Sequence, residues 1–89
     1  MAPQLEMPGR DGNSVTARFD GVDGLEIIDR TTNPMVTPKA VEQARRQAAV
    51  AAYNGYQAVW ELPTPQAVDA ARRFMGHAKV STIVVRLAG

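Results

Sequence analysis

Cysteine is absent from this sequence of 89 residues, and aromatic side chains are few, with two tyrosines, two phenylalanines and one tryptophan. Without cysteine, neither a disulfide framework nor a thiolate metal site can form. A chain of this length rarely builds two independent cores. Because alanine supplies much of the hydrophobic content, we expect one small domain with a thin core.

Long apolar runs and a large charge of one sign are also missing. No stretch approaches the roughly 20 apolar residues that a transmembrane helix requires, so we expect no membrane span. The first residues lack the basic and apolar segments of a signal peptide, and none is expected. Ten basic and nine acidic residues give a formal net charge of +1, which neither points to nucleic acid nor excludes it.

The N-terminal third of the chain predicts a β-hairpin that follows an arm. Residues 1–14 contain two prolines and two glycines without a periodic pattern, which predicts a flexible arm or the remnant of a linker. Residues 15–19 alternate between apolar and polar side chains, and residues 25–30 predict the return strand. The glycines in residues 21–24 suit the turn between them.

Two helices, each followed by a strand, are predicted after the hairpin. Both helices begin with a Thr-Pro pair, in which threonine can cap the helix and proline suits its first position. The predicted ranges are 38–53 and 65–75 for the helices and 56–62 and 81–87 for the strands. Such connections make neighbouring strands parallel, and the apolar run in the last strand favours an interior position. The prediction is an α/β fold over residues 15–89, with a mixed sheet flanked by helices.

Asp20 and Asp29 are the leading candidates for chemistry. Asp20 ends the first strand of the predicted hairpin. Asp29 lies in the return strand, where alternation places it on one face with Ile27 and Thr31. Two carboxylates brought together here could hold a divalent cation that activates water for attack on a phosphodiester. The alternative is that both are ordinary turn and strand-end residues.

Residues 15–30, VTARFDGVDGLEIIDR, resemble restriction-endonuclease-fold toxin domains of bacterial polymorphic toxins. Those domains look like members of the PD-(D/E)XK nuclease superfamily. The similarity continues through QARRQ at residues 43–47 and WELP at residues 60–63, and it covers residues 15–87. It implies a restriction-endonuclease-like core, but the helix that usually opens that core is not evident here. The chain is then either a minimal core or the C-terminal part of a toxin.

The resemblance implies a metal-dependent nuclease acting on DNA or RNA. Asp20 would be the first metal-binding aspartate and Asp29 the acidic residue of the (D/E)XK element, with the Arg30 carbonyl as a further ligand to Mg²⁺ or Mn²⁺. It also implies that the domain is part of a larger secreted toxin, delivered by a bacterial export system into the cytoplasm of a target cell. A cognate immunity protein would then block the site.

Thr31 departs from this pattern, because it stands where the family has a lysine and carries no cation. Three explanations stay open: a substituted and inactive form, a natural variant whose lysine function has moved, or a nuclease-like fold that only binds. Lys39 is the nearest candidate for a relocated lysine, although a solvated side chain is the simpler interpretation.

Polar residues of the first predicted helix complete the set of candidates. Gln43 and Gln47 share a helix face, with Arg46 at its shoulder, and these side chains could touch phosphate or order the site. A polar face turned to solvent is the alternative. Arg30, Lys39 and Arg46 are the candidate contacts to nucleic acid. The leading hypothesis is a nuclease; the alternatives are a non-catalytic binding or assembly module and a small structural domain of a larger assembly.

Overall fold

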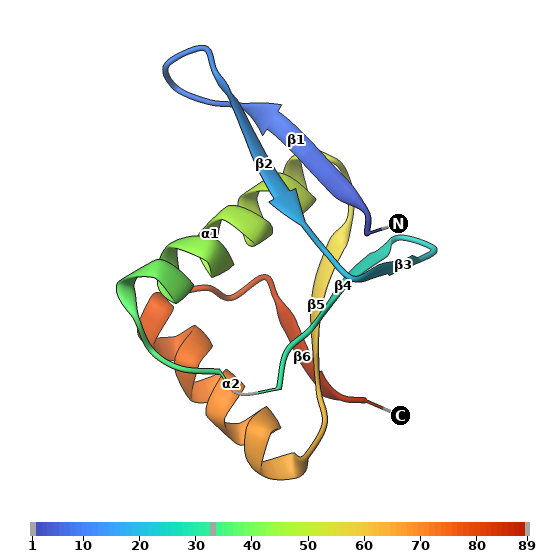
Figure 1. The fold of residues 1–89 in the computed structure, drawn as a ribbon, viewed down its shortest axis with the longest axis vertical. Helices are drawn as coiled ribbons and strands as arrows, with labels where there is room; N and C mark the ends of the chain where they lie inside the picture. Colours follow the sequence, from blue (N-terminus) through green and yellow to red (C-terminus); the bar gives the residue numbers. More distant parts are fainter. Residues whose placement is uncertain (1, 33, 89) are drawn as a thin grey trace.

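The protein has two layers, a pair of helices and a four-stranded sheet, with a two-stranded hairpin at one end (Figure 1). The computed structural model describes residues 2–32 and 34–88. The elements in chain order are β1 (Gln4–Pro8), β2 (Ser14–Arg18), β3 (Gly21–Asp23), β4 (Glu26–Arg30), α1 (Pro38–Tyr53), β5 (Gln57–Leu62), α2 (Pro65–Ala78) and β6 (Val84–Leu87). The predicted α/β class is confirmed.

The four-stranded sheet has the strand order β3-β4-β5-β6. β3 and β4 are antiparallel, whereas β4, β5 and β6 run parallel to one another, as the helices between them require. The mixed sheet and its parallel connections are therefore as predicted. The last strand is shorter than predicted and lies at an edge, because β5 takes the interior position beside it. Its register places Asp29 beside Trp60, and Trp60 beside Val85.

The N-terminal hairpin differs from the prediction. Residues 4–8, expected to belong to a flexible arm, form β1 and pair with β2 along its whole length. Leu5 and Met7 of β1 pack against the core, which supplies the apolar burial that orders this segment. Because β2 pairs with β1, the partner of β4 is instead β3, which lies in the predicted turn. The turn itself contains Gly24, whose φ of +59° favours glycine.

Both helices begin at the predicted Thr-Pro pairs. The side-chain oxygens of Thr37 and Thr64 accept hydrogen bonds of 3.1 Å from the backbone N–H groups of Ala40 and Ala67, respectively. A proline follows each threonine, where its missing N–H costs no helical hydrogen bond. The same local chemistry therefore starts both helices.

The two helices end differently. α1 ends at Tyr53, as predicted. α2 continues through Gly76, which was the predicted stop, because glycine is tolerated inside a helix at a modest cost. It ends where Lys79 adopts a left-handed φ of 58°. Neither helix in the described part of the chain has the length and apolar character needed to cross a membrane.

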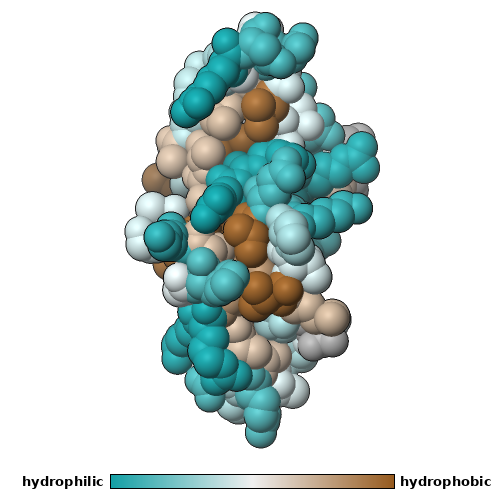
Figure 2. Space-filling model, turned by 90° about the vertical axis from the view of Figure 1, so that its left-hand side faces the viewer, coloured by the Kyte–Doolittle hydropathy of each residue, from teal (hydrophilic) through white to brown (hydrophobic). Residues whose placement is uncertain are grey.

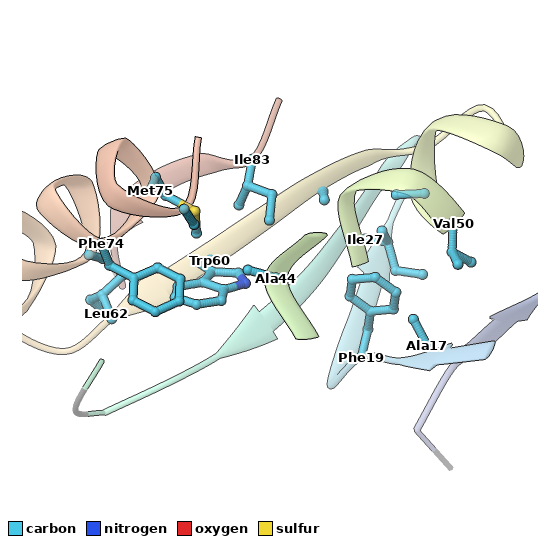
Figure 3. Close-up of a cluster of buried hydrophobic side chains, with 14 of the residues drawn as sticks. Ala17, Phe19, Ile27, Ala44, Val50, Trp60, Leu62, Phe74, Met75 and Ile83 are labelled. Carbon is cyan, nitrogen blue, oxygen red and sulfur yellow. The ribbon is translucent and has the colours of Figure 1, made fainter. Parts of the chain in front are cut away.

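The core lies between the sheet and the helices, which are on the same side of the sheet (Figure 1). Figure 3 shows it as two groups joined at Ala44, one around Trp60 and Phe74 and one around Phe19 and Ile27. The ring centroids of Trp60 and Phe74 are 5.4 Å apart. Ala44 is fully buried, and its small side chain lets α1 approach the sheet closely.

The outer surface of the helix layer is mostly polar, with apolar groups appearing between the polar ones (Figure 2). Met35 and Val36, in the segment that leads into α1, are among the exposed large hydrophobic residues, at 62% and 55% exposure. Scattered exposed apolar residues of this kind are normal for small domains. This surface by itself identifies no function.

Candidate functional site

Asp20 and Asp29 meet beside the C-terminal end of β4. Oδ2 of Asp20 accepts a hydrogen bond of 2.7 Å from the backbone N–H of Arg30. The backbone N–H of Asp20 donates to the carbonyl oxygen of Ile28 at 2.8 Å. These bonds join Asp20 to the residues on either side of Asp29. As a result, the two carboxyl groups come within hydrogen-bonding reach of each other.

The two carboxyl groups have opposite pKa shifts. The backbone N–H of Arg30, and then the hydrogen bond with Asp29, lower the pKa of Asp20 below its ordinary value. Burial raises the pKa of Asp29 to about 6; the hydrogen bond from Gln47 opposes this rise, and the adjacent Asp20 reinforces it. Adjacent carboxyl groups with separated pKa values share one proton at intermediate pH. A divalent cation could take the place of that proton.

Gln47 links α1 to this carboxyl pair. Gln47 is 1% exposed, and its Nε2 donates to Oδ2 of Asp29 at 3.0 Å. Its Oε1 accepts a hydrogen bond of 2.9 Å from Nε1 of Trp60. Because an indole nitrogen can only donate, it determines which end of the amide faces it and turns the NH₂ group toward Asp29. Gln47 is therefore a buried part of the site, and the solvent-facing alternative does not describe it.

A cavity of about 310 Å³ opens beside the carboxyl pair. Polar groups of Asp29, Thr31 and Gln43 line one part of it, and the rings of Trp60 and Phe74 line another. The remaining lining residues come from the start of α1 and the segment before it: Pro34, Met35, Thr37 and Ala40. This combination of carboxylate, hydroxyl, amide and aromatic groups is suited to a ligand with both polar and flat apolar parts.

The other predicted residues are divided between the site and its surroundings. Lys39 is exposed and does not line the cavity beside Asp29 and Thr31. The side chain of Arg30 alternates to the opposite face of β4, where its Nε lies 3.3 Å from Oε1 of Glu61. Only the backbone of Arg30 therefore takes part in the carboxyl pair.

The opposite face of the sheet carries a separate ionic network. Arg86 of β6 pairs with Glu26 at 2.9 Å and with Glu61 at 3.0 Å. Glu26 thus points away from Asp29, as the alternation along the strand predicts. Since these groups bind one another, they add nothing to the candidate metal site.

The donor set at the carboxyl pair fits a hard divalent cation with few protein ligands. Within residues 2–32 and 34–88, no group of three or more histidine, cysteine, aspartate or glutamate side chains gathers at one point. Asp20 and Asp29 would therefore be the two side-chain ligands, and backbone carbonyl groups and water would complete the coordination. Mg²⁺ is commonly held in this way, through one or two carboxylates and several waters.

Comparison of this chain with protein-family models, curated proteins and solved structures gives no match. Function has therefore to be inferred from the carboxyl pair, the buried amide behind it and the cavity beside it.

Proposed function

We propose that this chain is a metal-dependent nuclease domain that hydrolyses phosphodiester bonds in DNA or RNA. The observation that supports this most directly is the pair of adjacent carboxyl groups, Asp20 and Asp29, beside a cavity with polar and aromatic walls. Above the pKa of about 6 of Asp29, both carboxylates are free to bind a cation. Oxygen donors of this kind suit Mg²⁺ or Mn²⁺.

Asp20 and Asp29 would hold the cation, and the carbonyl oxygen of Arg30 is a third candidate ligand. A cation bound there supplies Lewis acidity at a phosphoryl oxygen and lowers the pKa of water. Gln47 keeps the Asp29 carboxylate in one orientation, and Gln43, which lines the cavity, can donate its amide N–H to a phosphate oxygen. Trp60 and Phe74 form the apolar wall that limits the access of water.

Thr31 supports a second candidate, a nuclease-like module that binds nucleic acid without cutting it. Its side chain lines the cavity, at the position where the resemblance implies a lysine. Threonine cannot supply the positive charge that stabilises a developing phosphorane. Cleavage by the chain as it stands should therefore be slow or absent, whereas cation binding should persist.

The arrangement of a hairpin, two helices and parallel strands supports a restriction-endonuclease-like core that lacks its usual first helix. The resemblance of residues 15–30 supports a place in a larger secreted bacterial toxin that acts in the cytoplasm of a target cell. A cognate immunity protein would then cover the carboxyl pair.

The first test is cleavage of DNA and RNA in the presence of Mg²⁺ or Mn²⁺. Four proteins are compared: the native chain, Thr31→Lys, Thr31→Lys combined with Asp29→Asn, and the native chain carrying Asp23→Asn. Asp23 is an exposed aspartate of β3 outside the carboxyl pair, and its substitution matches the charge change of Asp29→Asn.

Each outcome of this test has a definite meaning. If the native chain or Thr31→Lys cuts and Asp29→Asn abolishes the cutting, the nuclease proposal is supported. Cutting by Thr31→Lys alone identifies Thr31 as the cause of a disabled site. If no variant cuts but the native chain binds Mn²⁺ and nucleic acid, the binding module is correct. If no variant cuts and none binds a divalent cation, both proposals are wrong.

A further inference from the structure

A second cavity, of about 180 Å³, lies between β2 and α1. Its lining residues are Thr16, Ala17, Arg18, Gln43, Arg46 and Gln47. Arg18 and Arg46 are the charged members of this set, and they come from two different elements. A concave site that carries two guanidinium groups and no lining carboxylate favours an anion.

The two arginines have only weak partners within the described residues. Nε of Arg18 donates to the exposed side chain of Gln4 at 3.3 Å. Arg46 pairs with Glu42 at 3.0 Å, where the side chains are 42% and 73% exposed. An ion pair at this exposure adds little to stability. A phosphate group can therefore displace these partners at low cost and take both guanidinium groups.

This arginine cleft, lined by Arg18 and Arg46, shares residues with the carboxyl pair. Gln43 lines both the arginine cleft and the cavity beside Asp29. Gln47 also lines the cleft, and its Nε2 contacts the Arg18 carbonyl oxygen at 3.5 Å and Oδ2 of Asp29 at 3.0 Å. A polynucleotide whose backbone passes the carboxyl pair would therefore meet the two arginines next.

We propose that Arg18 and Arg46 bind a backbone phosphate of the nucleic acid, adjacent to the phosphate that faces Asp20 and Asp29. The inference deepens the proposed function, on which the identity of the ligand rests. Guanidinium groups bind phosphate through paired N–H donors, a geometry that lysine does not reproduce. The arginine cleft thus positions the strand, and the carboxyl pair is the separate site of chemistry.

The test is the binding of a fluorescent single-stranded oligonucleotide of roughly 12 nucleotides, within the usual range for one small domain. DNA and RNA versions are titrated by anisotropy at low salt in EDTA, so that cleavage plays no part. Arg18→Ala combined with Arg46→Ala should weaken binding on the order of tenfold. Arg72→Ala combined with Arg73→Ala removes the same charge from exposed positions of α2 and should weaken it by less than about twofold.

Two further measurements separate a phosphate contact from a general charge effect. Loss of one phosphate contact should reduce the slope of log affinity against log salt by about 0.7 for a single strand. The charge-conserving pair Arg18→Lys and Arg46→Lys should recover only part of the lost affinity, since lysine lacks the paired donors. Thermal unfolding of every variant shows whether the fold is retained.

Several outcomes would overturn the proposal. Equal losses in the two double alanine variants would mean that binding follows net charge and not the arginine cleft. Absence of binding by the native chain at low salt would also exclude it. Because cleavage is not measured, the cleft can be upheld in a chain that never cuts, and a cutting chain can still lose the cleft.

Discussion

Nε1 of Trp60 donates a hydrogen bond of 2.9 Å to Oε1 of Gln47, in the buried space between β5 and α1. The indole thereby points the amide NH₂ of Gln47 at Asp29, 3.0 Å away. Figure 3 shows the indole nitrogen on the side of Ala44, which lies one helical turn from Gln47. In the part of the chain that the structure describes, no buried side-chain polar atom lacks a partner. Trp60 therefore joins the apolar core to the carboxyl pair.

Trp60→Phe should loosen this link while an aromatic ring still contacts Phe74. The substitution leaves Oε1 of Gln47 without its donor, which should lower the free energy of unfolding by about 1–3 kcal/mol. The amide is then free to turn. Since the Gln47 hydrogen bond opposes the raised pKa of Asp29, that pKa should rise above about 6. Urea unfolding measures the first effect, and a carboxyl ¹³C NMR titration measures the second.

Phe74→Leu is the control for Trp60→Phe, because it disturbs the same aromatic contact without removing a hydrogen bond. It should cost stability and leave the titration of Asp29 near its native midpoint. If Trp60→Phe also leaves that midpoint unchanged, the indole is only a packing residue.

Asp29→Asn should stabilise the protein at neutral pH. Between the ordinary value of 3.8 and about 6, the folded chain holds a proton on Asp29 that the unfolded chain releases. The free energy of unfolding therefore falls as the pH rises through this window. The lowered pKa of Asp20 acts in the opposite direction, and its contribution is lost as the pH falls below the ordinary value. Asn at position 29 removes the first decline, and after solvent screening the gain at neutral pH should be about 1 kcal/mol.

Urea unfolding from about pH 4 to about pH 8 tests this prediction. The native protein and the Asp23→Asn control should both lose stability on going from pH 4 to pH 6, and Asp29→Asn should lose less. An unchanged slope for Asp29→Asn would show that its carboxyl group is not held protonated by the fold.

The helices and parallel strands could be predicted from the sequence because their causes are local. Thr-Pro capping and apolar spacing act within one or two turns, and helices between strands impose parallel pairing. β1 could not be found in this way. Leu5 and Met7 alternate, but prolines flank them, and their burial depends on contact with β2 and α1. The partner of β4 was missed for the same reason, since strand pairing is decided by distant segments.

At the site, the meeting of Asp20 and Asp29 could be predicted because strand side chains alternate with a fixed period. The burial of Gln47 could not, since a polar residue on an amphipathic helix usually faces solvent. Trp60 was expected in the core, but its role as a donor depends on the β4–β5 register that places it beside Asp29. Only a correct pairing of these strands would have linked the indole to the carboxyl pair.

The two Thr-Pro starts should contribute similar stability. Thr37→Ala and Thr64→Ala each remove a hydrogen bond of 3.1 Å to a backbone N–H, and each should lower the free energy of unfolding by about 1 kcal/mol. Thr37→Ser and Thr64→Ser keep the hydroxyl group and should restore most of that loss. Chemical denaturation of the four variants checks the values. An alanine variant as stable as the native chain would show that capping is not what starts its helix.

Cation binding should follow the protonation of the carboxyl pair. Below about pH 6, a cation must displace the proton on Asp29, so the affinity for Mn²⁺ should rise about tenfold per pH unit and then level off. Calorimetry in buffers of different ionisation enthalpy should detect about one proton released per cation on the acid side. Asp20→Asn and Asp29→Asn should each abolish binding, whereas Thr31→Ala should keep it, because the proposed ligands at this end of β4 are the two carboxylates and the Arg30 carbonyl. An affinity that does not depend on pH would contradict this assignment, since it would place the cation away from the one carboxyl group whose pKa is raised to about 6.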